Sequence, residues 1–247
     1  AKDVCAYLSY HEAPATAVSP FTKTAVKDAG VKPFKVVIED QKACARYSGL
    51  VIEGVQVKDS PSWLKNRLQT IGVRSINNIV DITNYILHET GQPLHAFDAQ
   101  QIEGATVVVK KYPADTLFVT LDGTERKLAA NDLMISDTQK PLCIAGVFGG
   151  LKSGVSEDTK NIFLESAWFE NVHVRKTSLH HGLRTDAATR FEKGVDIAGT
   201  VNVLERAAQL IQELAGGKCS EVVDVYPSPA TKKTVVLTYA YLKKLSG

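Results

Sequence analysis

Apolar residues alternate with polar ones in several short stretches of this 247-residue chain, and this period is typical of β-strands. Two such stretches lie early in the chain, at residues 35–39 and 47–57. Five more are expected between residues 105 and 167, at 106–109, 117–121, 133–136, 142–147 and 162–165, and a last one lies at 222–225. Asp122 and Gly123 predict a hairpin turn in this region.

Helical periodicity marks the segments on either side of the strand-rich region. A short helix is expected at residues 3–10. A second helix opens at Ser60 and Pro61, with the serine as cap and the proline in the first position, and it ends at Gly72. A third starts at Ser75 and ends at Gly91, and its apolar face consists of Ile76, Ile79, Val80, Ile86 and Leu87.

Two later helices begin at acidic residues. Asp186 is expected to cap a helix over residues 187–193, which Gly194 stops. Asp196 is expected to cap the next helix, which ends at the glycine pair 216–217. The apolar face of this helix consists of Val203, Ala207, Ile211 and Leu214.

Helices thus lie mainly early and late, with many short strands between them. This order favours an α+β fold, with mixed or antiparallel β-sheets and flanking helices, over a doubly wound parallel sheet. Residues 1–34, a short helix followed by an irregular run, are interpreted as a linker or the tail of a preceding module. The main domain is expected to span residues 35–226, and the proline-containing residues 227–247 are interpreted as a linker and the start of a further module.

Composition and charge exclude few classes of function. No apolar run reaches the roughly 20 residues of a membrane-spanning helix. The N-terminus has neither a basic leader nor an apolar core, and the only methionine is Met134, so we expect no secretory signal and a fragment or processed chain. The four cysteines are far apart, which is typical of incidental buried thiols in a cytosolic protein rather than of a zinc site.

A basic segment runs from His173 to Gly194, where five basic residues stand against two acidic ones, although the net charge of the chain is only +2. Such a segment suits a phosphate backbone, and it equally suits a solvated surface. The five basic residues are Arg175, Lys176, Arg184, Arg190 and Lys193.

Three tempting motifs fail on their spacing. The glycine-rich residues 146–153 lack the glycine directly before the lysine of a phosphate loop, because Leu151 stands there. The adjacent pair His180 and His181, with His173, does not complete a metal-ligand set, so no metal site is expected. No serine lies in a nucleophile-elbow pattern. From its residues alone, the chain is an α+β domain with a glycine-rich corner and one basic segment.

Six longer strings resemble the beta subunit of bacterial phenylalanyl-tRNA synthetase. They lie in the order of that family at residues 74–85 (RSINNIVDITNY), 91–98 (GQPLHAFD), 120–123 (TLDG), 145–150 (AGVFGG), 164–167 (LESA) and 181–196 (HGLRTDAATRFEKGVD). One departure is Thr189, which follows Ala188 where the family often has a serine after alanine. The resemblance implies a tRNA-editing domain at residues 35–226, without the anticodon-binding and catalytic-like modules of the subunit.

The resemblance also implies an activity, which is hydrolysis of the ester in mischarged Tyr-tRNA(Phe). Carried over by motif, Glu165 would bind the tyrosine hydroxyl, and Gly149 and Ala187 would line the pocket. His95 and Thr185 would lie at the ester end and would serve catalysis by orienting a water molecule.

Plainer interpretations of the same residues stay open. Glu165 also suits a salt bridge at a strand end, Ala187 a first-turn helix residue, Thr185 a helix cap and His95 a structural histidine. The module also suits a non-catalytic tRNA-docking or subunit-interface role, or hydrolysis of a different aminoacyl-tRNA.

The resemblance implies partners and location as well. The partners would be the tyrosine-carrying 3′ end of tRNA(Phe) and the synthetase alpha subunit in an α2β2 assembly, with no membrane partner. The location would be cytoplasmic. No cofactor or metal is expected in this fragment, whereas ATP and Mg²⁺ are expected for the whole enzyme.

Overall fold

The computed structural model describes residues 2–21, 25–229, 231 and 234–246. Parts of the predicted N-terminal tail and C-terminal linker, at residues 1, 22–24, 230, 232–233 and 247, lie outside the described residues.

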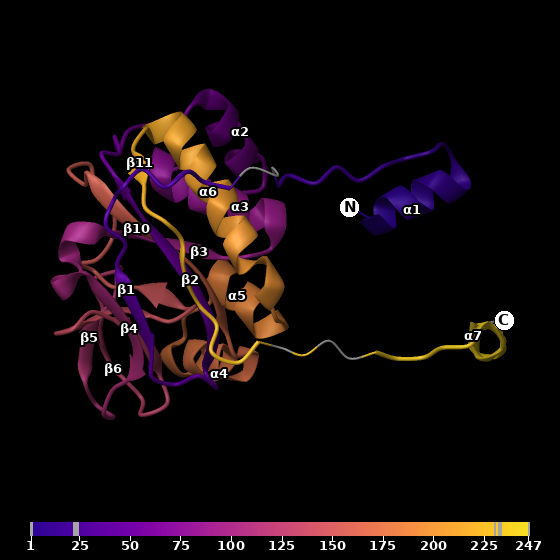
Figure 1. Cartoon of the computed structure of the whole chain (residues 1–247). Coiled ribbons are helices and arrows are strands. Elements are labelled where there is room, and N and C mark those ends of the chain that lie inside the picture. Colours follow the sequence, from indigo (N-terminus) through magenta and orange to yellow (C-terminus); the bar gives the residue numbers. More distant parts are fainter. Residues whose placement is uncertain (1, 22–24, 230, 232–233, 247) are drawn as a thin grey trace.

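Two five-stranded β-sheets form the centre of the molecule (Figure 1). The central sheet has the order β11-β2-β10-β3, with β12 also paired to β2. Its strands are β2 (Cys44–Glu53), β3 (Leu94–Asp98), β10 (Asn161–Phe169), β11 (Lys218–Cys219) and β12 (Val223–Val225). All of its pairings are antiparallel.

The outer sheet has the order β1-β4-β7-β8-β9, and only its β1–β4 pairing is parallel. Its strands are β1 (Lys35–Ile38), β4 (Thr106–Lys111), β7 (Leu133–Ser136), β8 (Pro141–Ile144) and β9 (Phe148–Gly149). The short strands β5 (Leu117–Val119) and β6 (Glu125–Lys127) form a separate hairpin around Asp122 and Gly123, as the sequence predicted. The α+β fold with mixed and antiparallel sheets is therefore confirmed.

The two faces of the central sheet are buried against different layers, because successive side chains of a strand point to opposite sides. Leu50, Ile52 and Leu164 pack against α2 (Ser62–Thr70), α3 (Asn78–Thr90) and α6 (Thr200–Ala215). Figure 1 shows α3 and α6 lying over this face. The opposite face, with Tyr47, Val51, Phe97 and Phe163, packs against the outer sheet. The interior between the two sheets is where the candidate site lies.

Several helix starts differ from the prediction. Helix α2 begins at Ser62 with Pro61 at its cap, and α3 begins at Asn78, where the Asn77 side chain accepts the amide hydrogens of Ile79 and Val80. The two serines expected at these starts bind a buried carboxylate instead. Ser60 Oγ donates to Asp81 Oδ2 at 2.5 Å, and Ser75 Oγ donates to the same oxygen. Asp81 thereby ties the segments before both helices together.

Helix α5 (Asp186–Lys193) is capped by Thr185 rather than by Asp186, which stands in its first turn. Asp196 caps a short 3₁₀ helix, η3 (Ile197–Gly199), that leads directly into α6. Two further 3₁₀ turns, η1 (Ala99–Gln101) and η2 (Glu103–Ala105), connect β3 to β4. Helix α4 (Asn171–His181) and strands β3, β9 and β11 were not predicted.

Two helices at the ends of the chain lie away from the sheets (Figure 1). They are α1 (Lys2–His11) and α7 (Tyr239–Ser246), and neither contains a buried residue. Within the described part of the chain, the elements from β1 to β12 contain the buried core. The domain boundaries at residues 35 and 226 stay a prediction.

Candidate functional site

Glu165 lies on the middle of β10, directly opposite Gly49 of β2 on one side and His95 of β3 on the other. Directly opposite residues in an antiparallel sheet point to the same face. Glu165 and His95 therefore both point into the interior between the sheets, where the neighbouring side chains on the same face are apolar. A carboxylate at such a position needs polar partners, because burying a charge without them is costly.

Glu165 has one such partner. The hydroxyl of Tyr47 donates a hydrogen bond to Glu165 Oε2 at 2.7 Å. The other oxygen, Oε1, receives no hydrogen bond from the described residues, yet it is not among their fully buried unpaired atoms. Burial raises the pKa of the Glu165 carboxyl to about 7, although the bond from Tyr47 lowers it. Glu165 has no basic partner in the described part of the chain, so the salt-bridge interpretation is wrong.

His95 is neutral at physiological pH. Burial lowers its pKa to about 4, and its Nε2 atom is buried without a hydrogen-bond partner among the described residues. Its ring packs edge-on against Phe97, with 4.4 Å between the ring centroids. An unpaired imidazole nitrogen can accept or donate one hydrogen bond, depending on its tautomer.

Gly149 in β9 faces the His95 ring from the outer sheet. A Cβ atom placed on Gly149 would lie 3.3 Å from His95 Cε1, which is tighter than most such contacts. Glu165, His95 and Gly149 are therefore neighbours, although they come from three strands that are far apart in the sequence.

Thr185 links helix α5 to the same corner of the outer sheet. Its Oγ1 accepts the amide hydrogen of Ala188 at 3.0 Å and donates its own proton to the carbonyl of Val147 at 2.9 Å. Val147 lies just before β9, so this hydroxyl fixes α5 beside the strand that contains Gly149. The helix-cap interpretation of Thr185 is confirmed, and the hydroxyl proton is already committed to Val147.

Ala187 occupies the first turn of α5 and is half-buried. The structure thus brings Glu165, His95 and Gly149 into direct proximity and connects Thr185 to them through Val147. Ala187 is placed near this group only through its position on the same helix as the Thr185 cap.

Three buried residues that interact with Glu165 were not predicted as site residues. They are Tyr47, through its hydrogen bond, and Cys44 and Cys143, through the charge of Glu165. Burial, and then the nearby Glu165 charge, raise the pKa of both thiols well above its ordinary value, so both stay protonated. The local sequence gave no sign of the role of Tyr47, because its link to Glu165 depends on the pairing of β2 with β10.

The basic segment is divided between a structural part and an exposed part. His181 Nε2 lies 2.7 Å from Asp132 Oδ2 with its side chain almost fully buried, and Thr177 donates to the other oxygen of Asp132 at 2.8 Å. By contrast, Arg175, Lys176, Arg184 and Lys193 are exposed. Among the described residues, no group of three or more His, Cys, Asp or Glu side chains is placed to hold a metal ion.

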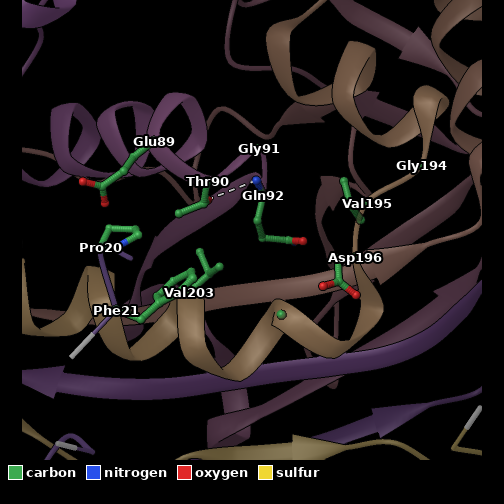
Figure 2. Close-up of a pocket in the computed structure, with 11 residues that line it drawn as sticks. Pro20, Phe21, Glu89, Thr90, Gly91, Gln92, Gly194, Val195, Asp196 and Val203 are labelled. Atoms are coloured by element: carbon green, nitrogen blue, oxygen red, sulfur yellow. Dashed lines mark hydrogen bonds between the residues drawn. The ribbon is translucent and has the colours of Figure 1, made fainter. Parts of the chain in front are cut away.

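A separate cavity of about 400 Å³ lies between the end of α3 and the start of α6, and Pro20 and Phe21 also line it (Figure 2). Gln92 lines it, with its amide nitrogen donating to the Ala167 carbonyl at 2.8 Å and its Oε1 unpaired among the described residues. Glu89 and Asp196 lie at opposite sides of the opening in Figure 2. None of the five predicted site residues lines this cavity.

Residues 43–216 match the B3/4 domain family, which is most of the chain. The chain belongs to the B3/4 domain family. The match runs from just before β2 to just after α6, so it leaves out β1, β11 and β12 but includes every site residue described above.

This B3/4 domain is similar over its whole length to phenylalanine–tRNA ligase beta subunits. It is 50% identical over 248 residues to that of Bacteroides fragilis and 49% identical over 250 residues to that of Porphyromonas gingivalis. In each case the chain spans about 30% of the relative's length. A further beta subunit, from Bdellovibrio bacteriovorus, is 50% identical over 196 residues, covering 79% of the chain and 24% of the relative. The resemblance to this subunit is confirmed.

The fold also matches a solved structure. A crystal structure of an N-terminal fragment of the phenylalanyl-tRNA synthetase beta subunit from Pyrococcus horikoshii superposes with a TM-score of 0.53. The two share 15% identity, and the match covers 92% of this chain and 62% of the other. At this identity the likeness supports the fold alone. No helix within the described residues is long and apolar enough to span a membrane.

Proposed function

We propose that this B3/4 domain is the proofreading module of a phenylalanine–tRNA ligase beta subunit and that it hydrolyses mischarged Tyr-tRNA(Phe). The observation that carries the proposal is Glu165, a carboxylate in an apolar interior with one oxygen bonded to Tyr47 and the other unpaired. The phenolic hydroxyl of a bound tyrosine would donate a hydrogen bond to this second oxygen of Glu165. The similarity to phenylalanine–tRNA ligase beta subunits supplies the substrate class.

A second site of this kind is needed because a synthetic site cannot fully exclude tyrosine by the size of its pocket. Tyrosine differs from phenylalanine by one hydroxyl, and a hydrophobic pocket rejects an added hydroxyl by only about 10²-fold. A site that accepts a hydrogen bond from the hydroxyl selects in the opposite direction. Phenylalanine bound there would leave the Glu165 oxygen unpaired, at a cost of about 1–3 kcal/mol or more for a charged group.

The proposed reaction is attack of a water molecule on the ester carbonyl carbon. The bond to the ribose oxygen breaks, and free tyrosine and deacylated tRNA result. Neutral His95 has an unpaired ring nitrogen with which to orient this water or a ribose hydroxyl. Thr185 has no free proton to donate, so we assign it the role of holding α5, with Ala187, against the Gly149 strand.

Glu165→Ala in the full-length synthetase tests the proposal. Loss of a hydrogen bond to a charged group, about 1.5–3 kcal/mol, should lower hydrolysis of Tyr-tRNA(Phe) by roughly 10- to 150-fold. The ratio between Tyr-tRNA(Phe) and Phe-tRNA(Phe) hydrolysis should narrow, while aminoacylation stays normal. Unchanged selectivity would remove Glu165 from this role. Aminoacylation by the same preparation is the control for correct folding.

A second candidate is a non-catalytic module for tRNA docking or subunit contact. The exposed Arg175, Lys176, Arg184 and Lys193 favour it, since they suit a phosphate backbone. Charge reversal of these residues that lowers tRNA affinity, together with normal proofreading in Glu165→Ala, would favour docking over editing.

The editing proposal carries further parts. The substrate end would be the 3′ terminus of tRNA(Phe), the protein partner would be the alpha subunit, and the location would be the cytoplasm. Hydrolysis would need no cofactor from this segment, whereas ATP and Mg²⁺ would serve aminoacylation elsewhere in the whole enzyme.

A further inference from the structure

Among the described residues, the Tyr47 hydroxyl donates the one hydrogen bond that the Glu165 carboxyl group receives, and both side chains are buried. We propose that Tyr47 is a positioning residue for substrate selection, because it holds Glu165 Oε2 so that Oε1 is kept for the substrate hydroxyl. This inference rests on the proposed editing function and deepens it. It assigns the tyrosine preference to a pair of side chains rather than to the carboxylate alone.

Tyr47 is the donor in its hydrogen bond with the ionised Glu165. Burial, and then the negative charge of Glu165, raise the pKa of the Tyr47 hydroxyl well above its ordinary value. Tyr47 therefore keeps its proton and donates it to the carboxylate. In return, this bond lowers the pKa of Glu165 against the larger effect of burial. Tyr47 thus increases the fraction of Glu165 that is ionised near neutral pH.

The ring of Tyr47 is itself held in place. It stacks on Phe163 with 6.5 Å between centroids and 12° between planes, and Phe163 stacks in turn on Phe34 at 5.6 Å. The Phe163 ring covers Gly49, where a Cβ atom would lie only 2.3 Å from its Cζ. Gly49 is the residue directly opposite Glu165 on β2. The missing side chain at Gly49 therefore makes room for the ring that supports Tyr47.

This arrangement determines what the site can recognise. With Oε2 occupied by one phenol, the carboxylate has Oε1 left to accept the hydroxyl of a bound tyrosine. Without the Tyr47 hydroxyl, the buried carboxyl would hold a proton more tightly, and a neutral carboxyl no longer offers the charged acceptor that favours tyrosine. The preference for the tyrosine ester should then weaken even though Glu165 is unchanged.

Tyr47→Phe in the full-length synthetase is the first test. It keeps the aromatic stack and removes one hydroxyl. We expect the ratio of Tyr-tRNA(Phe) to Phe-tRNA(Phe) hydrolysis to fall roughly 10-fold or more. The pH at which the tyrosine preference reaches half its maximum should move upward. A purely structural role would lower both hydrolysis rates without moving this midpoint.

Tyr112→Phe is the matched control. The Tyr112 hydroxyl is also buried, beside the same core, but it has no hydrogen-bond partner among the described residues. Its removal should leave selectivity and the pH midpoint unchanged. A double variant, Tyr47→Phe with Glu165→Gln, should be no less selective than Glu165→Gln alone, because Tyr47 is proposed to act through Glu165.

An independent measurement does not require activity. Carbon-13 NMR of glutamate side chains in the chain described here follows the titration of Glu165 directly. We expect the midpoint to rise in Tyr47→Phe and to stay in place in Tyr112→Phe. An unmoved Glu165 midpoint, or unchanged selectivity of Tyr47→Phe beside normal wild-type editing, overturns the inference. Wild-type enzyme that does not hydrolyse Tyr-tRNA(Phe) would instead contradict the proposed function, whatever the titration shows.

Discussion

Glu165 and His95 lie directly opposite each other on β10 and β3, yet burial moves their pKa values in opposite directions, to about 7 and about 4. Burial disfavours the charged form of each group, which is the ionised carboxylate in one case and the protonated imidazole in the other. Near pH 6 the pair is therefore mostly neutral, in an interior that also contains the protonated Tyr47, Cys44 and Cys143.

These two shifts predict opposing effects of pH on stability. The folded pKa of Glu165, about 7, exceeds its ordinary value of 4.5, so the folded protein binds more protons than the unfolded chain in that window and stability falls as pH rises. The folded pKa of His95, about 4, lies below its ordinary 6.5, so stability rises with pH between those values. Between about pH 4.5 and 6.5 the two slopes offset each other.

Single substitutions should separate the two slopes. In Glu165→Gln, the free energy of unfolding should rise between pH 4 and 6.5, because only His95 still contributes a slope. In His95→Gln, it should fall between pH 4.5 and 7, because only Glu165 does. Each slope is at most about 1.4 kcal/mol per pH unit. Urea unfolding across pH 4–8 measures both. Identical pH profiles for the wild type and Glu165→Gln would show that Glu165 does not titrate in this window.

Two glycines, one in each sheet, should respond differently to alanine. Gly49→Ala would place Cβ 2.3 Å from the Phe163 ring, so it should destabilise the fold by about 1–3 kcal/mol. Gly149→Ala would place Cβ 3.3 Å from His95, a contact that a small shift relieves, so its cost should be under about 1 kcal/mol. Denaturation curves compare the two. A larger loss of stability in Gly149→Ala would contradict this order.

The Gly149→Ala variant also separates an effect on function from an effect on stability. Gly149→Ala narrows the space beside His95. It should therefore lower the rate of Tyr-tRNA(Phe) hydrolysis by the full-length synthetase, while the free energy of unfolding changes little. Normal hydrolysis by Gly149→Ala would show that the substrate does not pass between these two residues.

Asp132 should be essential for docking α4 on the outer sheet. Its two oxygens bind the Ala129 amide at 2.8 Å, the Thr177 hydroxyl at 2.8 Å and His181 Nε2 at 2.7 Å. Asp132→Ala leaves these buried groups unpaired and should cost about 3 kcal/mol or more. The exposed Asp158→Ala is the control and should change stability by less than about 0.5 kcal/mol. Equal melting temperatures for the two variants would refute the role of Asp132.

Periodicity predicted the strands that carry long apolar runs and missed those that do not. The strand at 47–57 was found, at shifted bounds, because β2 buries nearly all of its side chains. Strand β3 is short and directly follows Pro93, so the local sequence gives little sign of it. Its pairing with β10 is a contact between segments about 70 positions apart, which no local pattern encodes. Helix α4 was missed because its buried positions, Val174, Thr177 and Ser178, include only one apolar residue.

The site was predicted from motif strings, and its supports were not. Glu165, His95 and Gly149 stand in the quoted strings, and the structure brings these three together. The helix starts were misplaced because Ser60 and Ser75 bind Asp81, a tertiary contact that competes with capping. Tyr47 was overlooked because a tyrosine in an apolar strand indicates a core residue, and its partner lies on another strand.

The isolated chain should bind tRNA weakly, because its net charge is only +2 and one basic segment offers few cations to phosphates. Within the described part of the chain, no carboxylate pairs with the five basic residues of this segment, which are Arg175, Lys176, Arg184, Arg190 and Lys193. All of them except Arg190 are exposed. Phosphate contacts from these five residues would give a slope of log affinity against log salt of about −3.5 to −4.5. Reversing Arg175 and Lys176 to glutamate should reduce the magnitude of this slope by about 1.5.

Lys65→Glu on α2 is the control and should leave the salt slope unchanged, because Lys65 already pairs with Asp59 at 3.0 Å. Fluorescence titrations across a range of KCl concentrations measure the slope, and submicromolar affinity at physiological salt would mean that the chain binds tRNA through contacts other than this basic segment.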